Sequence, residues 1–124
     1  MQSTEMKAFV LDALDTLFNR RDYEAAARAW SPDYIQHAAF VPPGRDALFA
    51  LVRKLPEGSR YEAGLAVIEG EHVMIHGRYT MPGRPVMISV DIFRIEDGQL
   101  AEHWDVLQKE VDPMKSASGM RMFG

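Results

Sequence analysis

Two aspartates and a histidine stand close together in the segment VDIFRIEDGQLAEHWDV. Asp91, His103 and Asp105 interrupt two runs that alternate apolar and polar side chains, as half-buried strands do. Strand interiors are depleted in aspartate, and an unpaired buried carboxylate is costly. Carboxylates and imidazoles in an apolar environment are groups that can exchange protons near neutral pH. The segment therefore indicates a site for acid/base chemistry, with a buried salt bridge to Arg78 or Arg94 as the structural alternative.

The turn at Asp97-Gly98 decides which side chains of this segment share a face, because a one-residue slip reverses every side chain. In a two-residue loop, Asp91 lies opposite Trp104. In a three-residue loop with Gly98 as a left-handed bulge, Asp91 lies opposite His103. Propensity does not choose between the two registers. The bulged register gathers Asp91, Phe93, His103, Asp105 and Leu107 on one surface and leaves Val90, Ile92, Arg94, Leu100, Glu102 and Trp104 on the other.

Three helices and five strands are predicted to position these side chains. The helices run from a cap at Ser3 or Thr4 to near Arg20, from Tyr23 to Trp30 before the Ser31-Pro32 dipeptide, and from Arg45 to Leu55. A short extended segment at Tyr34–His37 comes between the last two helices, and four strands follow at Tyr61–Glu69, His72–Met81, Val86–Ile95 and Gln99–Gln108. This order predicts an α+β domain with the helices on one face of a curved antiparallel sheet.

The composition narrows the classes of function. The chain of 124 residues fits one domain, in which only the tail from about residue 112 to 124 is expected to be loose. Without cysteine, thiolate catalysis is excluded. A net charge of −4 with scattered Lys and Arg argues against nucleic acid as a partner. No apolar stretch is long enough to span a membrane, so we expect a soluble, cytoplasmic protein without a membrane partner.

A resemblance to a known family adds to this interpretation. The pattern DIFR…DG…EHWD, with YIQH at Tyr34–His37 and Gly44 opening the next helix, resembles the SnoaL-like polyketide cyclases, in the superfamily typified by nuclear transport factor two and ketosteroid isomerase. The likeness covers nearly the whole chain up to about Val111. It implies a cone-shaped, strongly curved sheet closed by three N-terminal helices around a pocket, and it implies the bulged register. Relatives often continue YIQH with asparagine and proline where this chain has Ala38-Ala39, so a polar group is expected to be missing near the pocket mouth.

The resemblance also implies roles for individual residues. Asp91 takes the place of an acid or oxyanion donor, and Asp105 that of the general acid/base of the cyclases, with His103 beside it to hold its charge. His37 lies about where the isomerases carry a general base. The candidate substrate contacts are Tyr34, Phe93, His76 and Trp104; Tyr34 can donate to a carbonyl, His76 shares a strand face with Met74, and Trp104 alternatively packs at a subunit interface on the convex face.

These residues predict a cofactor-independent acid/base enzyme for a small, mostly apolar or aromatic carbonyl compound. His37 or Asp105 would remove a proton α to the carbonyl and Asp91 would stabilise the enolate, as in aldol-type cyclisation, isomerisation or dehydration. The alternative is a non-catalytic module for ligand binding or dimerisation on the same scaffold.

Under either hypothesis, the apolar stripe of Val90, Ile92, Leu100 and Trp104 predicts a homodimer through the outer face of the sheet. No cofactor is expected. The residue types of His37, His76 and His103 with one aspartate would suit a two-histidine, one-carboxylate metal site, but no short ligand spacing supports it, and no metal is expected.

Overall fold

The computed structural model describes residues 1–124 as three α-helices packed on a five-stranded sheet. The helices are α1 (Ser3–Leu14), α2 (Tyr23–Ala29) and α3 (Arg45–Arg53), and a π-helical turn, η1 (Asp15–Asn19), continues α1. The strands are β1 (Trp30–Gln36), β2 (Arg60–Glu69), β3 (His72–Thr80), β4 (Met87–Glu96) and β5 (Gln99–Lys109). The predicted α+β fold class is confirmed.

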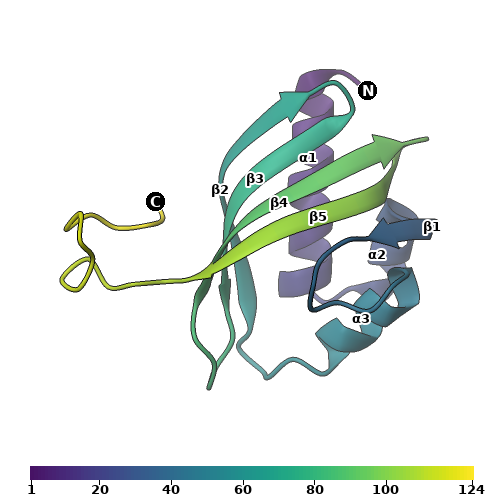
Figure 1. Ribbon diagram of the computed structural model, residues 1–124. Coiled ribbons are helices and arrows are strands. Elements are labelled where there is room, and N and C mark those ends of the chain that lie inside the picture. Colours follow the sequence, from purple (N-terminus) through teal and green to yellow (C-terminus); the bar gives the residue numbers. More distant parts are fainter.

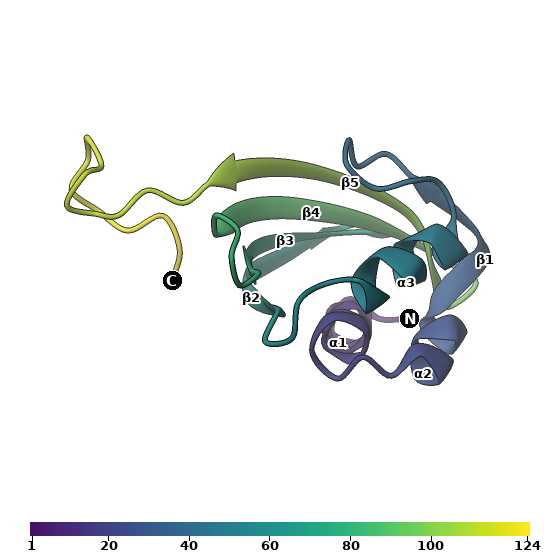
Figure 2. The ribbon, with the colours of Figure 1, turned by 90° about the horizontal axis from the view of Figure 1, so that it is seen from below.

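The sheet is mixed, with strand order β1-β5-β4-β3-β2. Strands β2 to β5 form an antiparallel meander, and β1 pairs with β5 in parallel. The sheet is strongly curved, and the three helices lie inside its curve, with α1 against β2 and β3 and α3 near β1 (Figures 1 and 2). None of the helices combines the length and the apolar character needed to cross a bilayer.

The N-terminal helix differs in detail from the prediction. Gln2, rather than Ser3 or Thr4, is its N-cap, and the Gln2 backbone N–H donates to Glu5 Oε1 at 3.3 Å. The π-helical turn at its end places Asn19 beside the start of β2, where the Asn19 amide donates to the Tyr61 carbonyl and accepts from the Tyr61 N–H. The helical layer is thereby fixed to the edge strand of the sheet.

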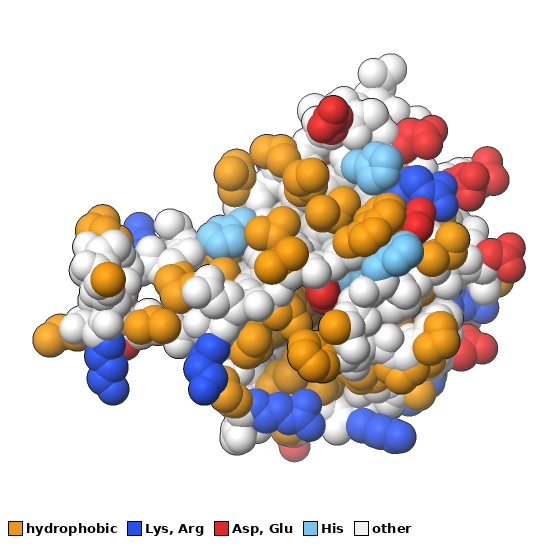
Figure 3. Space-filling model, in the orientation of Figure 1, with side chains coloured by type: hydrophobic (Ala, Val, Ile, Leu, Met, Phe, Trp, Pro, Cys, Tyr) orange, Lys and Arg blue, Asp and Glu red, His pale blue; other side chains and the backbone are white.

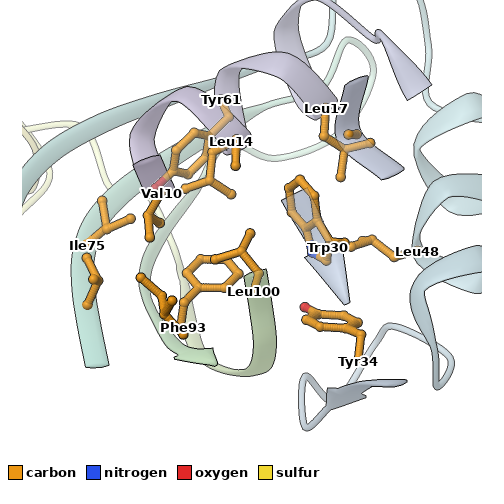
Figure 4. Packing of buried hydrophobic residues seen from close by; sticks show 14 of the residues in the cluster. Val10, Leu14, Leu17, Trp30, Tyr34, Leu48, Tyr61, Ile75, Phe93 and Leu100 are labelled. Carbon is orange, nitrogen blue, oxygen red and sulfur yellow. The ribbon is translucent and has the colours of Figure 1, made fainter. Parts of the chain in front are cut away.

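The core fills the space between the helices and the concave side of the sheet. Its 19 buried residues include Val10 and Leu17 of the first helical segment, Trp30 of β1 and Leu100 of β5 (Figure 4). The second helix ends one residue earlier than predicted, because Trp30 already has extended backbone and places its indole in this core. Trp30 is therefore the first residue of a strand that the sequence predicts only from Tyr34 onward.

The β4–β5 hairpin has neither of the two predicted registers. Asp97 and Gly98 both have positive φ (51° and 72°), and Glu96 pairs with Gln99, so the turn is a two-residue loop. The register then shifts by one residue at Ala101, which has no partner in β4.

Beyond this bulge, Asp91 pairs with Asp105 and Phe93 with His103. The side chains grouped by the resemblance therefore do share a face, but the bulge responsible for it lies within β5 and not at Gly98. Leu100, before the bulge, is fully buried in the core, and its predicted place on the outer surface is wrong.

Candidate functional site

A cavity of about 430 Å³ lies between the concave side of the sheet and the helices. Thirteen of its eighteen lining residues are hydrophobic, so a ligand inside it is held in a largely apolar environment. The polar groups at its wall come from β1, from β3, from β5 and from the turn between β3 and β4. The lining residues that bear on function are Tyr34, Gln36, Phe93, His103, Asp105 and Arg84.

Asp91 lies behind this wall and does not line the cavity, because its carboxylate is fully buried among neighbouring side chains of the sheet. Its Oδ2 accepts hydrogen bonds from the Ser89 hydroxyl at 2.8 Å and from the Tyr79 hydroxyl at 3.1 Å, and its Oδ1 lies 2.8 Å from His103 Nε2. A carboxylate with this many partners is well satisfied without a ligand. The predicted contact between Asp91 and an enolate oxygen is therefore not seen, and the carboxylate holds His103 instead.

The hydrogen-bond pattern assigns the protons of this cluster. Gln36 Oε1 accepts the backbone N–H of Ala38 at 3.0 Å, which identifies that atom as the amide oxygen. His103 Nδ1, 2.7 Å from the same oxygen, must therefore be a donor. The contact between His103 Nε2 and Asp91 Oδ1 then contains one proton, whichever of the two atoms carries it. The buried pair is neutral as a unit, and both imidazole nitrogens are occupied.

Asp105 is the one carboxylate that faces the cavity. It pairs directly across from Asp91 in the sheet, it is half-buried, and it accepts no hydrogen bond and forms no ion pair within the chain. Burial raises the pKa of Asp105 above its ordinary value of 3.8, a nearby positive charge on His103 would lower it, and the charge of Asp91 raises it further. An unpaired carboxylate with a raised pKa, open to an apolar cavity, is suited to take a proton from a carbon acid.

Tyr34 supplies a second free group at the same wall. Its hydroxyl accepts from Gln36 Nε2 at 3.2 Å and donates to nothing in the chain. Burial raises the pKa of this phenol, so the hydroxyl keeps its proton at neutral pH. Its ring lies beside Trp30 and faces Phe93 and Leu100 across the interior (Figure 4). Tyr34 can therefore donate a hydrogen bond to an oxygen atom of a ligand.

Three predicted site residues lie outside the cavity. His37 follows Gln36 on the opposite face of the chain; its Nε2 contacts Glu102 Oε2 at 2.7 Å, and its ring stacks on Trp104 with centroids 4.8 Å apart. The hydrogen bonds from His37 and Arg94 lower the pKa of Glu102. This cluster occupies the outer side of the sheet, so neither His37, predicted as the general base, nor Trp104, predicted as a ligand contact, lines the cavity.

His76 also lies on the outer side, because Ile75 takes the inward position next to Asp91. The His76 ring contacts Phe123 of the C-terminal segment, with centroids 5.3 Å apart. The sharing of a face with Met74 therefore indicates the outer surface and not the pocket. The salt-bridge alternative is not seen either: Arg78 pairs with Glu110 and Arg94 with Glu102, both away from Asp91.

A metal ion does not fit this arrangement of side chains. Asp91, His103 and Asp105 present ligand atoms within 4.8 Å of one another. His103 offers no lone pair to a cation, since it donates from Nδ1 and shares a proton at Nε2, and Asp91 already accepts at both oxygens, so Asp105 alone of the three has a free ligand atom. The histidines of the considered two-histidine site, His37, His76 and His103, are not brought together.

Sequence reasoning missed Gln36 and Arg84. Two residues apart on one strand, Tyr34 and Gln36 share a face. This spacing could have predicted that Gln36 faces the pocket with Tyr34. In the structure, Gln36 connects Tyr34 to His103 by hydrogen bonds. The Pro82-Gly83 dipeptide marked the turn that carries Arg84, but nothing in the sequence placed this turn over the cavity.

Comparisons with known proteins agree with this fold. TsrD from Streptomyces laurentii is 21% identical with a TM-score of 0.71, and the alignment covers 87% of this chain and 91% of that one. A protein from Kribbella flavida named "putative ketosteroid isomerase" is 16% identical with a TM-score of 0.76, covering 98% and 97% of the two chains. One from Acidithiobacillus ferrooxidans named "putative polyketide cyclase" is 17% identical with a TM-score of 0.70, covering 83% and 87%.

No curated protein sequence matches the chain. The family model described as the SnoaL-like domain matches residues 10–103. These residues run from the C-terminal part of α1 through β4, with the Asp91 carboxylate, and into β5 as far as His103, the partner of that carboxylate. The chain therefore belongs to the SnoaL-like domain family, as the sequence pattern indicated.

Proposed function

We propose that the protein is a cofactor-independent acid/base enzyme that acts on a small, mostly apolar carbonyl compound through an enolate. The observation that carries this proposal is the presence of two groups with free capacity at the wall of an apolar cavity: the Asp105 carboxylate, which accepts no hydrogen bond, and the Tyr34 hydroxyl, which donates none. Asp105 removes a proton α to the carbonyl, and Tyr34 donates a hydrogen bond to the oxygen on which negative charge develops.

The buried cluster behind the wall fixes the donor. Asp91 holds the His103 ring, His103 Nδ1 holds the Gln36 amide, and Gln36 Nε2 donates to the Tyr34 oxygen. A hydroxyl that already accepts one hydrogen bond has its own proton directed elsewhere, and the apolar lining leaves few competing acceptors. We infer that His103 and Asp91 are positioning residues and that Asp105 and Tyr34 contact the reacting atoms.

Aldol-type cyclisation, isomerisation and dehydration all begin with this proton transfer, and the proposal covers the shared step. A solvent deuterium exchange experiment tests it directly: the protein is incubated with small ketones and β-keto esters in D2O, and loss of the α-proton signal is followed by NMR. Asp105→Asn should slow the exchange by about 10²–10⁴-fold, and Tyr34→Phe by about 10²–10³-fold.

Matched controls come from the same chain. Tyr23→Phe removes a hydroxyl from a ring that packs on Phe49 and under Arg53, away from the cavity, and should leave exchange unchanged. Exchange that survives Asp105→Asn would refute the assignment of the base.

The second candidate is a ligand-binding module without catalysis. The apolar character of the cavity favours it, since thirteen of eighteen lining residues are hydrophobic. Ligands that shift resonances of the lining residues while no ligand in the panel exchanges protons would support this alternative over the enzyme.

A homodimer through the outer face remains part of the proposal. Figure 3 shows hydrophobic side chains gathered over the face of the sheet that is turned away from α1. Val90, Val106 and Met74 on neighbouring strands are 40%, 68% and 37% exposed, and such a row is typical of an interface. Val106→Glu should shift the sedimentation coefficient to that of a monomer, and an unchanged coefficient would exclude this face.

A further inference from the structure

We propose that the ligand carries an anionic group, a carboxylate or a phosphate, at the end of an apolar body, and that Arg84 binds this group at the cavity rim. Arg84 is the only Lys or Arg among the lining residues, and it forms no ion pair. Its one side-chain hydrogen bond is a long contact, 3.9 Å, to the sulfur of Met81. A guanidinium has five donors, so this one retains the capacity for a two-point contact with an anion.

The turn that carries Arg84 holds the residue in place. Pro82 and Gly83 occupy the central positions, Gly83 has a φ of 81°, and the Arg84 N–H donates to the Met81 carbonyl at 3.0 Å. This is the pattern of a type II turn, with proline fixing one backbone angle and glycine accepting the positive φ. Pro85 restricts the backbone of Arg84 from the other side. The cation is thus presented from a stiff turn, which reduces the entropy lost on binding.

The position of this turn sets the shape of the ligand. Met87, the first residue of β4 after the turn, lies four residues from Asp91, a distance of about 13 Å along a strand. Asp91 is the cross-strand partner of Asp105, so the proposed base lies about that far along the sheet from the turn, and these two points are the ends of the proposed ligand site. Hydrophobic side chains, Met87 and Leu107 among them, line the wall between these ends. The ligand that satisfies both ends has a carbonyl near Tyr34 and Asp105, an apolar middle, and an anionic terminus beside Arg84.

This inference rests on the proposed function in taking the ligand to be a carbonyl compound, but its test reads binding and needs no turnover. The probes are a homologous series of ω-benzoylalkanoic acids, each with its methyl ester, titrated by calorimetry. For the best-fitting chain length, the acid should bind the wild type about 3–10-fold more tightly than its ester, as expected for a charge-assisted contact at an exposed residue. Arg84→Gln should remove this preference by weakening the acid alone.

Two further variants separate geometry from overall charge. Arg84→Lys keeps the positive charge but lacks the planar guanidinium that can bind an anion at two points, and it should retain part of the preference for the acid over the ester. Arg28→Gln removes an exposed, unpaired arginine that does not line the cavity and should change nothing. Repeating the titrations with the matching monoalkyl phosphates shows which anion the site prefers.

Equal affinity for acid and ester in the wild type, a preference that survives Arg84→Gln, or failure of every acid to bind would overturn the inference. Deuterium exchange that is absent from the wild type, or that survives Asp105→Asn, would refute the proposed enzyme while leaving an Arg84-dependent preference intact, so the two failures are distinguishable.

Discussion

Replacing Asp91 in two ways separates the hydrogen bonds of this residue from its charge. Asp91→Leu leaves the Ser89 hydroxyl, the Tyr79 hydroxyl and His103 Nε2 without their partner, and each orphaned buried group costs about 1–3 kcal/mol. Removing one partner of a buried ion pair costs about 3–5 kcal/mol, which overlaps the lower part of the range of about 3–9 kcal/mol for three such groups. We therefore expect Asp91→Leu to lower the free energy of unfolding by about 3–5 kcal/mol.

Asp91→Asn keeps the shape and the contacts. The amide oxygen can accept from both hydroxyls, and the amide nitrogen can donate to His103 Nε2, which becomes an acceptor because Nδ1 already carries a proton toward Gln36. Volume-conserving changes cost less than about 1.5 kcal/mol, and a neutral pair also avoids the desolvation of two charges. Asp91→Asn should therefore stay within about 1.5 kcal/mol of the wild type.

Urea unfolding followed by tryptophan fluorescence measures both values, and the ¹⁵N shifts of the His103 ring report its protonation. In Asp91→Asn we expect a neutral ring protonated at Nδ1 only. Deuterium exchange by this variant should remain within about 10-fold of the wild type, less than the loss expected at a general base, because Asp91 does not line the cavity. An Asn variant as unstable as the Leu variant would refute the reasoning from hydrogen bonds, and one as inactive as Asp105→Asn would refute the positioning role.

The same geometry leads to four further predictions. The rate constant kcat/KM should rise with pH through a midpoint above 3.8, because Asp105 acts as a base only when ionised and its pKa is raised; a midpoint at or below that value in a pH–rate profile would contradict this. The sign reverses for stability: a raised folded-state pKa means that ionisation of Asp105 destabilises the fold as pH increases, so Asp105→Asn should raise Tm at neutral pH and leave it unchanged near pH 3, measured by calorimetry. Phe93→Ala should cost about 3–5 kcal/mol in urea unfolding, since the ring is 2% exposed and stacks on His103 at 4.5 Å, and a cost below 1 kcal/mol would show that the wall repacks freely. His37→Ala should leave exchange unchanged and cost no more than about 1 kcal/mol, because its ion pair with Glu102 is exposed on the outer face; a loss of exchange would restore His37 as a base.

The succession of helices and strands could be predicted because local signals agree along most of the chain. The apolar spacing of the first and third helices, the Ser31-Pro32 dipeptide and the turn signals at Gly70 and Gly98 each correspond to an observed boundary. The first half of β1 was missed. It pairs with β5 at Trp30, and regular pairing resumes only at Ile35, so its extended form depends on a tertiary contact that no local sequence pattern encodes.

The candidate site was predictable in part. The alternation of β4 places Asp91 and Phe93 on one face, and this placement needs no knowledge of the partner strand. The residues of β5 that share this face are determined by the bulge at Ala101. The only sign of this bulge in the sequence is that Leu100 and Ala101 are adjacent apolar residues, and both are buried in the structure. His37 was assigned to the pocket because it resembles a catalytic position of the family. Its spacing of three residues from Tyr34 places the two side chains on opposite faces of a strand, and this signal was given less weight.

The bulge at Ala101 also bears on how the hairpin can change in length. In this chain, a regular ladder continued from the two-residue turn would pair Asp91 with Trp104, whose side chain would then face inward. The unpaired Ala101 shifts the register by one residue, so that Asp91 pairs with Asp105 instead. A chain lacking Ala101 would join Leu100 directly to Glu102 and form a regular ladder with Asp91 still opposite Asp105. A single-codon deletion at this position is therefore expected to preserve the orientation of every side chain in the cavity wall, whereas the same deletion at His103 would turn Trp104 inward. In evolutionary terms, the tip of the hairpin can gain or lose a residue at the bulge without a change in the side chains of β4 and β5 that face the cavity.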